Sequence, residues 1–134
     1  MSIEQNKQIA RRFFEQFIGQ GRFDVLAELA TPSFIDHSLP PGVTPAQIIG
    51  VFRAGFPDLT LTVEDQAAED DRVVTRWTVH GTHTGDFSGI PATGKTMTMP
   101  GITIQRLKDG KLVEAWVQYD QLGLLQQLGV IPTS

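Results

Sequence analysis

The spacing of hydrophobic positions changes from a helical to a strand-like period at Pro57. In residues 3–18, apolar side chains recur at helical spacing, and residues 23–30 form a shorter segment of the same kind. A third helix is expected to start at Thr44, which is a suitable N-cap before Pro45. The first part of the chain is therefore predicted to consist of helices.

Beyond Pro57, apolar and polar residues alternate, as is typical of strands. Residues 59–63 and 73–79 follow this pattern, and so do residues 95–106 and 112–119. The last two segments are joined at Asp109-Gly110, which is a strong hairpin signal. Helices followed by antiparallel strands predict an α+β fold, in which three N-terminal helices cover one face of a curved, mostly antiparallel sheet.

Composition and charge restrict the possible functions. A length of 134 residues fits a single domain, residues 1–134, and the absence of cysteine excludes disulfides, thiol catalysis and thiolate metal sites. The net charge is −4 with no basic block, so nothing indicates nucleic acid or an anionic membrane as a partner. The N-terminus is polar and no apolar run approaches the roughly 20 residues that a membrane span needs. A soluble, cytoplasmic protein is expected.

The final hairpin predicts which side chains share a face of the sheet. A turn about Asp109-Gly110 would place Asp120 opposite Met99, so that Trp116, Gln118 and Asp120 point to the same side as Met99. Apolar walls with a few polar groups suit a ligand pocket. A single β-bulge would exchange the two faces locally. The opposite face is expected to serve packing and carries Ile102, Ile104, Val113, Ala115 and Val117.

Asp120 has two possible roles, since it stands between the last strand and a short apolar segment. In a pocket, desolvation would raise its pKa and make it a general acid/base near neutrality. Alternatively, it is the N-cap of a helix that begins at Gln121, because Asp is a preferred N-cap residue. His37 is a second candidate, either as a neutral donor to a substrate carbonyl or as a structural histidine. Asp36 beside it is expected to cap a turn.

Five segments form a pattern that extends over nearly the whole chain. The most distinctive runs from Gly81 to Gly94 (GTHTGDFSGIPATG), shortly after Arg76-Trp77-Thr78. The others are residues 6–14, residues 34–37 and residues 109–129. In these segments the chain resembles the SnoaL-like polyketide cyclases of the nuclear transport factor 2-like superfamily. The resemblance implies a cone-shaped α+β fold, of the type also called cystatin-like, around a pocket.

The resemblance also implies a chemistry. In such cyclases an aspartate at the position of Asp120 is the acid/base in an intramolecular aldol closure of a polyketide ester, without a metal or organic cofactor. The expected ligand is therefore a small apolar or aromatic carbonyl or ester compound. Sheet-to-sheet pairing into a homodimer is implied as well, and a 14.8 kDa species in sedimentation at micromolar concentration would contradict it.

Two other kinds of site are not expected. Residues 89–96 match the P-loop pattern, but the alternation from Thr96 to Met99 predicts a strand where a phosphate-binding loop needs a helix. Lys95→Ala should accordingly leave stability and any activity nearly unchanged. The three histidines lack the spacing of a helical zinc motif, so no metal site is predicted.

Three functional classes remain open at this point. The first is a cofactor-independent lyase or isomerase of the polyketide cyclase type, with Asp120 and His37 as catalytic residues. The second is an epoxide-hydrolase-type enzyme, whose Asp-Arg-Asp arrangement Asp120 and Arg76 match only in part. The third is a non-catalytic binding or dimerisation module. The expected pocket or substrate-binding residues are Trp116, Gln118, Met99, Phe14, Arg76, Trp77 and Met97.

Overall fold

The computed structural model describes residues 2–132, so residues 1 and 133–134 of the expected domain lie outside it. The helices are α1 (Ile3–Arg12), which continues as the π-helical segment η1 (Phe13–Ile18), the 3₁₀ segment η2 (Phe23–Val25), α2 (Leu26–Leu29), α3 (Pro45–Gly55) and α4 (Gln121–Gln127). The strands are β1 (Ala30–Asp36), β2 (Thr60–Glu69), β3 (Arg72–Thr82), β4 (Thr96–Lys108) and β5 (Lys111–Tyr119).

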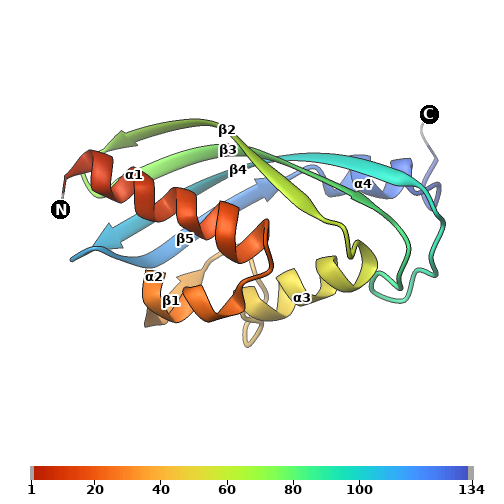
Figure 1. Cartoon of the computed structure of the whole chain (residues 1–134), viewed down its shortest axis with the longest axis horizontal. Helices are drawn as coiled ribbons and strands as arrows, with labels where there is room; N and C mark the ends of the chain where they lie inside the picture. Colours follow the sequence, from red (N-terminus) through yellow and green to blue (C-terminus); the bar gives the residue numbers. More distant parts are fainter. Residues whose placement is uncertain (1, 133–134) are drawn as a thin grey trace.

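The five strands form one curved sheet in the order β1-β5-β4-β3-β2. Only the pairing of β1 with β5 is parallel, and the other neighbours are antiparallel. Helix α1 crosses one face of the sheet, and α3 lies at the far end of the same side (Figure 1). The predicted α+β class, with N-terminal helices over a mostly antiparallel sheet, is confirmed.

Local signals at the helix starts agree with the sequence. Ser2 and Gln5 form a capping box at α1, and Thr44 forms one with Gln47 at α3. In each box the hydroxyl accepts from a backbone N–H while the glutamine side chain accepts from the N-cap N–H. None of the helices within residues 2–132 has the length and apolar character needed to cross a bilayer.

Strand β1 is an element that the sequence pattern did not predict. It includes Pro32, which lacks a backbone N–H, and its pairing with β5 is interrupted between Ala30 and Ile35. An edge strand tolerates such a proline because one side of its backbone has no sheet partner. Since the partner of β1 lies about eighty positions further along the chain, no local pattern reveals the pairing.

A β-bulge in β5 exchanges the two faces of the final hairpin. Near the turn, Leu107 pairs with Leu112, but further along Thr103 pairs with Val117 and Gly101 with Tyr119. One extra residue in β5 moves every following side chain to the other face. The predicted face assignment is therefore wrong. The side chains of Val117 and Tyr119 face the helices, whereas those of Trp116 and Gln118 face outward.

The outer face of the sheet carries exposed apolar side chains. Ile102 is 49% exposed and Ile104 is 38% exposed, so the helices do not cover this face as packing surface. Val117, which was expected beside them, belongs to the inner face. A second copy of the chain would bury Ile102 and Ile104 in the predicted homodimer, which stays a prediction.

Candidate functional site

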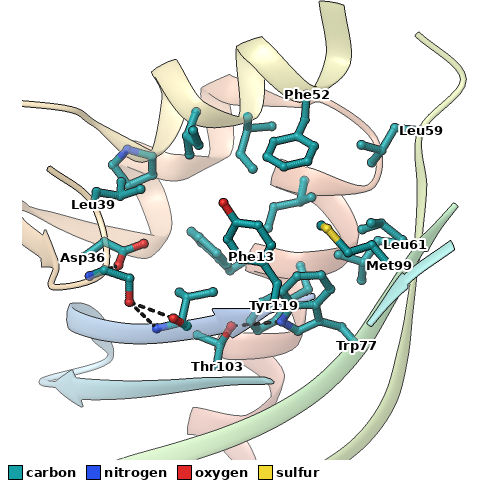
Figure 2. A pocket seen from close by; sticks show the side chains of 18 residues that line it. Phe13, Asp36, Leu39, Phe52, Leu59, Leu61, Trp77, Met99, Thr103 and Tyr119 are labelled. Carbon is teal, nitrogen blue, oxygen red and sulfur yellow. Dashed lines mark hydrogen bonds between the residues drawn. The ribbon is translucent and has the colours of Figure 1, made fainter. Parts of the chain in front are cut away.

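The inner face of the sheet and the helices above it enclose a pocket (Figure 2). The pocket and the open solvent at its mouth together contain about 760 Å³ of empty space. The walls are mainly aromatic and aliphatic, and the polar groups are few. The lining residues are Phe13, Phe14, Ile18, Asp36, Ser38, Leu39, Pro45, Ile48, Ile49, Phe52, Leu59, Leu61, Trp77, Val79, Met99, Thr103, Val117 and Tyr119.

The helical wall of the pocket includes the π-helical end of the first helix. Phe13 and Phe14 are buried, and their rings meet edge to face with centroids 5.2 Å apart. Phe14 also stacks on Trp77 of β3, at a centroid distance of 6.4 Å. A π-helical turn widens the backbone by one residue, and such turns often occur at functional sites. Here the turn brings Phe13, Phe14 and Ile18 to the cavity.

The indole of Trp77 lies across Gly101 on the floor of the pocket. A Cβ at position 101 would overlap the six-membered ring of Trp77, so only glycine permits this arrangement. Trp77 Nε1 donates a hydrogen bond to Thr103 Oγ1 at 2.9 Å. Trp77 and Thr103 are both buried, and the hydrogen bond fixes the orientation of the indole.

Asp36 is the carboxylate of the pocket. It ends strand β1, and its Oδ1 accepts a hydrogen bond from the backbone N–H of Ser38 at 2.8 Å. It therefore caps a turn, as predicted, but the half-buried side chain also lines the cavity. Burial raises the pKa of the Asp36 carboxyl above its ordinary value of 3.8, and the hydrogen bonds from Ser38 only partly oppose the rise.

Ser38 fixes the turn that carries Asp36 against strand β5. Its hydroxyl accepts from the backbone N–H of Val117 at 2.6 Å and donates to the carbonyl of Val117 at 2.9 Å. Both hydrogen bonds replace those that a continuing β1 would make, since the last backbone bond of this edge joins His37 to Ala115. The Ser38 hydroxyl is thus fully occupied, and Asp36 is held beside β5.

Tyr119 is the second polar group that faces the cavity. Its hydroxyl points to the middle of the pocket, with Asp36 at one side (Figure 2). Its ring packs edge to face on Phe52, at a centroid distance of 6.1 Å. Burial raises the pKa of the Tyr119 phenol above its ordinary value of 10.0, and the negative charge of Asp36 adds to the rise. The phenol therefore stays protonated at neutral pH and can donate a hydrogen bond.

Asp120 does not line the pocket, so its predicted position is wrong. The residue is exposed and is the N-cap of α4, where Oδ1 accepts from the backbone N–H of Gly123 at 2.9 Å. The alternative role as a helix cap is confirmed. The desolvation that its acid/base role required is missing, because the residue follows β5 on the solvent side.

His37, Trp116 and Gln118 also lie away from the cavity, on the outer side of the sheet. The His37 ring stacks on Trp116 with centroids 5.0 Å apart, and its Nε2 lies 2.7 Å from Glu114 Oε2. Gln118 is exposed. The expectation that these three side chains form pocket walls beside Asp120 is wrong. The bulge in β5 turns Trp116 and Gln118 outward, and His37, which follows β1, stacks on the outward-facing Trp116.

Arg76 is likewise exposed on the outer face, opposite Ile102 of β4, and does not line the pocket. Glu114 of β5 accepts a hydrogen bond from Arg106. That bond, followed by the bond to His37, lowers the pKa of Glu114. The partial Asp-Arg match to epoxide hydrolases therefore fails, because neither Asp120 nor Arg76 faces the cavity.

Phe14, Trp77 and Met99 line the cavity at positions that the sequence suggested, whereas Met97 is buried outside the lining. Sequence reasoning missed the polar residues Asp36 and Tyr119. Strand alternation would have found Tyr119 if the bulge had been known, because Tyr119 then shares a face with Thr103.

The loop before β4 leads into a strand, as the alternation from Thr96 to Met99 predicted. Thr96 begins β4, which confirms the predicted strand, so the helix that a phosphate-binding loop requires does not follow. His83 is buried, and its Nδ1 accepts from the backbone N–H of Thr93 at 3.2 Å, which holds the loop. Within residues 2–132, no three His, Asp or Glu side chains gather as ligands for a metal ion.

Comparison with known proteins identifies the family. Residues 8–128 match the model of the SnoaL-like polyketide cyclases. IdmH of Streptomyces antibioticus, named as a candidate polyketide cyclase, is 32% identical and has a TM-score of 0.80, over 94% of this chain and 99% of its own. A protein of Jannaschia sp. CCS1, named as a candidate SnoaL-like polyketide cyclase, is 31% identical with a TM-score of 0.82, over 98% and 97%.

A third similar structure carries a different name. AclR of Streptomyces galilaeus, named as a candidate hydroxylase, is 29% identical with a TM-score of 0.88, over 99% of this chain and 86% of its own. No curated protein sequence is significantly similar to the chain. Similar structures thus carry names for different reactions, while fold and family agree. The chain belongs to the SnoaL-like polyketide cyclase family.

Proposed function

We propose that the protein catalyses proton transfer at a carbon next to a carbonyl group, the acid/base step of an aldol-type cyclisation or isomerisation. Asp36 would remove the proton, and Tyr119 would donate a hydrogen bond to the developing enolate or alkoxide oxygen. The observation that carries this proposal is the pairing of a carboxyl and a phenol in an otherwise apolar pocket, with burial raising the pKa of each.

Asp36 has the properties of a general base for this step. A raised pKa makes a carboxylate a stronger base than an exposed aspartate. Among the described residues that line the cavity there is no Lys, Arg or His. The adjacent His37 lowers the pKa of Asp36 only in part, because burial is the larger effect. Ser38 supplies one backbone hydrogen bond, which orients the carboxylate.

Tyr119 complements the base as a neutral donor. No group in residues 2–132 forms a hydrogen bond with its hydroxyl, which faces the cavity and is free to bind a ligand oxygen. Donors that are already oriented toward a developing oxyanion typically contribute about 10²–10³ in rate. Aromatic walls from Phe14, Phe52 and Trp77 favour a planar, apolar substrate.

An exchange experiment tests the proposal without knowledge of the natural substrate. The ketone 1-phenylbutan-1-one in D₂O is followed by proton NMR, and loss of its α-proton signal measures proton abstraction. Wild-type protein should accelerate the loss over buffer. Asp36→Asn should lower the protein-dependent rate about 10²–10⁴-fold, because an amide is not a base.

The matched control is Asp120→Asn, an identical chemical change at the exposed cap. It should leave the exchange rate within about twofold, since Asn caps nearly as well as Asp. Full exchange activity in Asp36→Asn, or loss of it in Asp120→Asn, would contradict the proposal. Binding of the ketone by wild-type protein without accelerated exchange would instead support a non-catalytic binding module.

A further inference from the structure

The hydroxyl of Thr103 has a hydrogen without an acceptor. The indole Nε1 of Trp77 can only donate, so Thr103 Oγ1 must be the acceptor in their 2.9 Å hydrogen bond. The hydroxyl hydrogen of Thr103 remains to be donated. Within residues 2–132 the Thr103 hydroxyl makes no second hydrogen bond, although Thr103 is only 2% exposed.

Thr103 borders the ligand cavity, so a ligand bound there can supply the acceptor for its hydroxyl hydrogen. It lies on the floor in β4, opposite Val117 and diagonally next to Tyr119 (Figure 2). Leaving a buried donor without a partner costs free energy, whereas satisfying it with a ligand oxygen recovers that cost on binding. The hydrogen bond from Trp77 also restricts the rotation of the hydroxyl, because one side of its oxygen is already occupied.

We infer that Thr103 is a specificity-determining residue that donates a hydrogen bond to a second oxygen of the ligand. The ligand class is then an aromatic compound with two acceptor oxygens, one at Tyr119 and one at the floor. This inference rests on the proposed function, because it assumes that the same pocket binds the carbonyl substrate. A site with a fixed donor rejects analogues that lack the matching oxygen.

The test compares two probes that differ in one carbonyl group. Calorimetry gives the dissociation constants of 1-phenylbutane-1,3-dione and 1-phenylbutan-1-one for wild-type protein and for Thr103→Val and Thr103→Ser. Wild-type protein should prefer the diketone. Thr103→Val should weaken diketone binding about tenfold relative to the monoketone, as expected for one lost hydrogen bond. Thr103→Ser keeps the hydroxyl and should keep the wild-type preference.

The ratio of the two dissociation constants is the relevant quantity. Valine also removes the acceptor of the Trp77 indole, which affects both probes alike and cancels in the ratio. An unchanged ratio in Thr103→Val, or a wild-type protein without preference for the diketone, would overturn the inference and leave the proposed function intact. If neither probe binds the wild-type protein, the proposed function fails and this inference fails with it.

Discussion

Strands β1 and β5 lie side by side in parallel. Asp36 is the last residue of β1 and Asp120 directly follows β5, and both carboxylates accept a local backbone hydrogen bond. Asp36 accepts a hydrogen bond from the N–H of Ser38, and Asp120 accepts one from the N–H of Gly123. Their surroundings differ, because Asp36 lines the cavity, while Asp120 lies at the exposed start of α4. Local hydrogen bonding therefore does not distinguish a pocket acid from a helix cap; tertiary burial does.

The largest difference between the two aspartates should appear in the pH profile of ketone exchange. Activity should rise as Asp36 loses its proton, at a pKa above 3.8, and fall as Tyr119 ionises, above 10.0. Tyr119→Phe should lower the rate about 10²–10³-fold and abolish the falling limb. Rate measurements by NMR from acid to alkaline pH check this. Asp120→Asn should reproduce the wild-type profile, and a profile that depends on Asp120 instead would reverse the comparison.

Two glycines allow the same comparison, because Gly101 lies against Trp77 in the pocket and Gly123 lies against Asp120 at the helix cap. At Gly101 an added methyl group would overlap Trp77, so Gly101→Ala should cost about 1–3 kcal/mol and weaken ketone binding. At Gly123 it would meet the Asp120 carboxylate and disturb the cap. That loss of about 1 kcal/mol is offset by a gain of about 1 kcal/mol from alanine in a helix. In urea unfolding and ketone titration, Gly101→Ala should therefore lose stability and ketone affinity, whereas Gly123→Ala should keep both. Equal behaviour of the two variants would contradict the account.

A smaller effect is expected from removal of the cap itself. Asp120→Ala should lower the free energy of unfolding by about 1 kcal/mol, because the Gly123 N–H loses its acceptor, whereas Asp120→Asn should cost only a few tenths. Both variants should keep the ketone exchange rate. Thermal and urea unfolding provide the measurement. A loss of exchange in Asp120→Ala at full stability would indicate a role beyond capping.

The smallest expected effect is the pH dependence of stability from Asp36. Folded Asp36 binds its proton more tightly than the unfolded chain does, because its pKa is raised. Its contribution is therefore fully present below 3.8 and is lost as pH rises through the raised pKa. Asp36→Asn should remove this decline and be at least as stable as wild type at pH 7. If Asp36→Asn were less stable than wild type at pH 7 and equally stable in acid, the pH dependence would have the opposite sign and contradict this prediction.

The sequence predicted most of the fold because the fold depends on local patterns. The change of period at Pro57, the N-cap at Thr44 and the hairpin at Asp109-Gly110 all correspond to observed structure. The pocket chemistry depended on features without a local signal. The bulge after Leu112 is not marked by Gly or Pro, yet it decides which face Tyr119 occupies.

The sequence did not predict the position of Asp36 in the pocket, for a second physical reason. Its sequence context indicates a turn cap, and the cap exists. Its place in the pocket depends on the parallel pairing of β1 with β5 and on the hydrogen bonds from Ser38 to Val117, which join residues 79 positions apart. Such a contact follows from the assembled fold and not from the residues around Asp36.

The most direct test of the account is the titration of the Asp36 carboxyl. Carbon-13 NMR of protein labelled at aspartate side chains, with the Asp36 signal assigned by its absence in Asp36→Asn, gives this pKa without any substrate. The account predicts a value above the ordinary 3.8, because burial outweighs the hydrogen bonds from Ser38. A value at or below 3.8 would show a well-solvated carboxylate and would contradict the assignment of Asp36 as the pocket base.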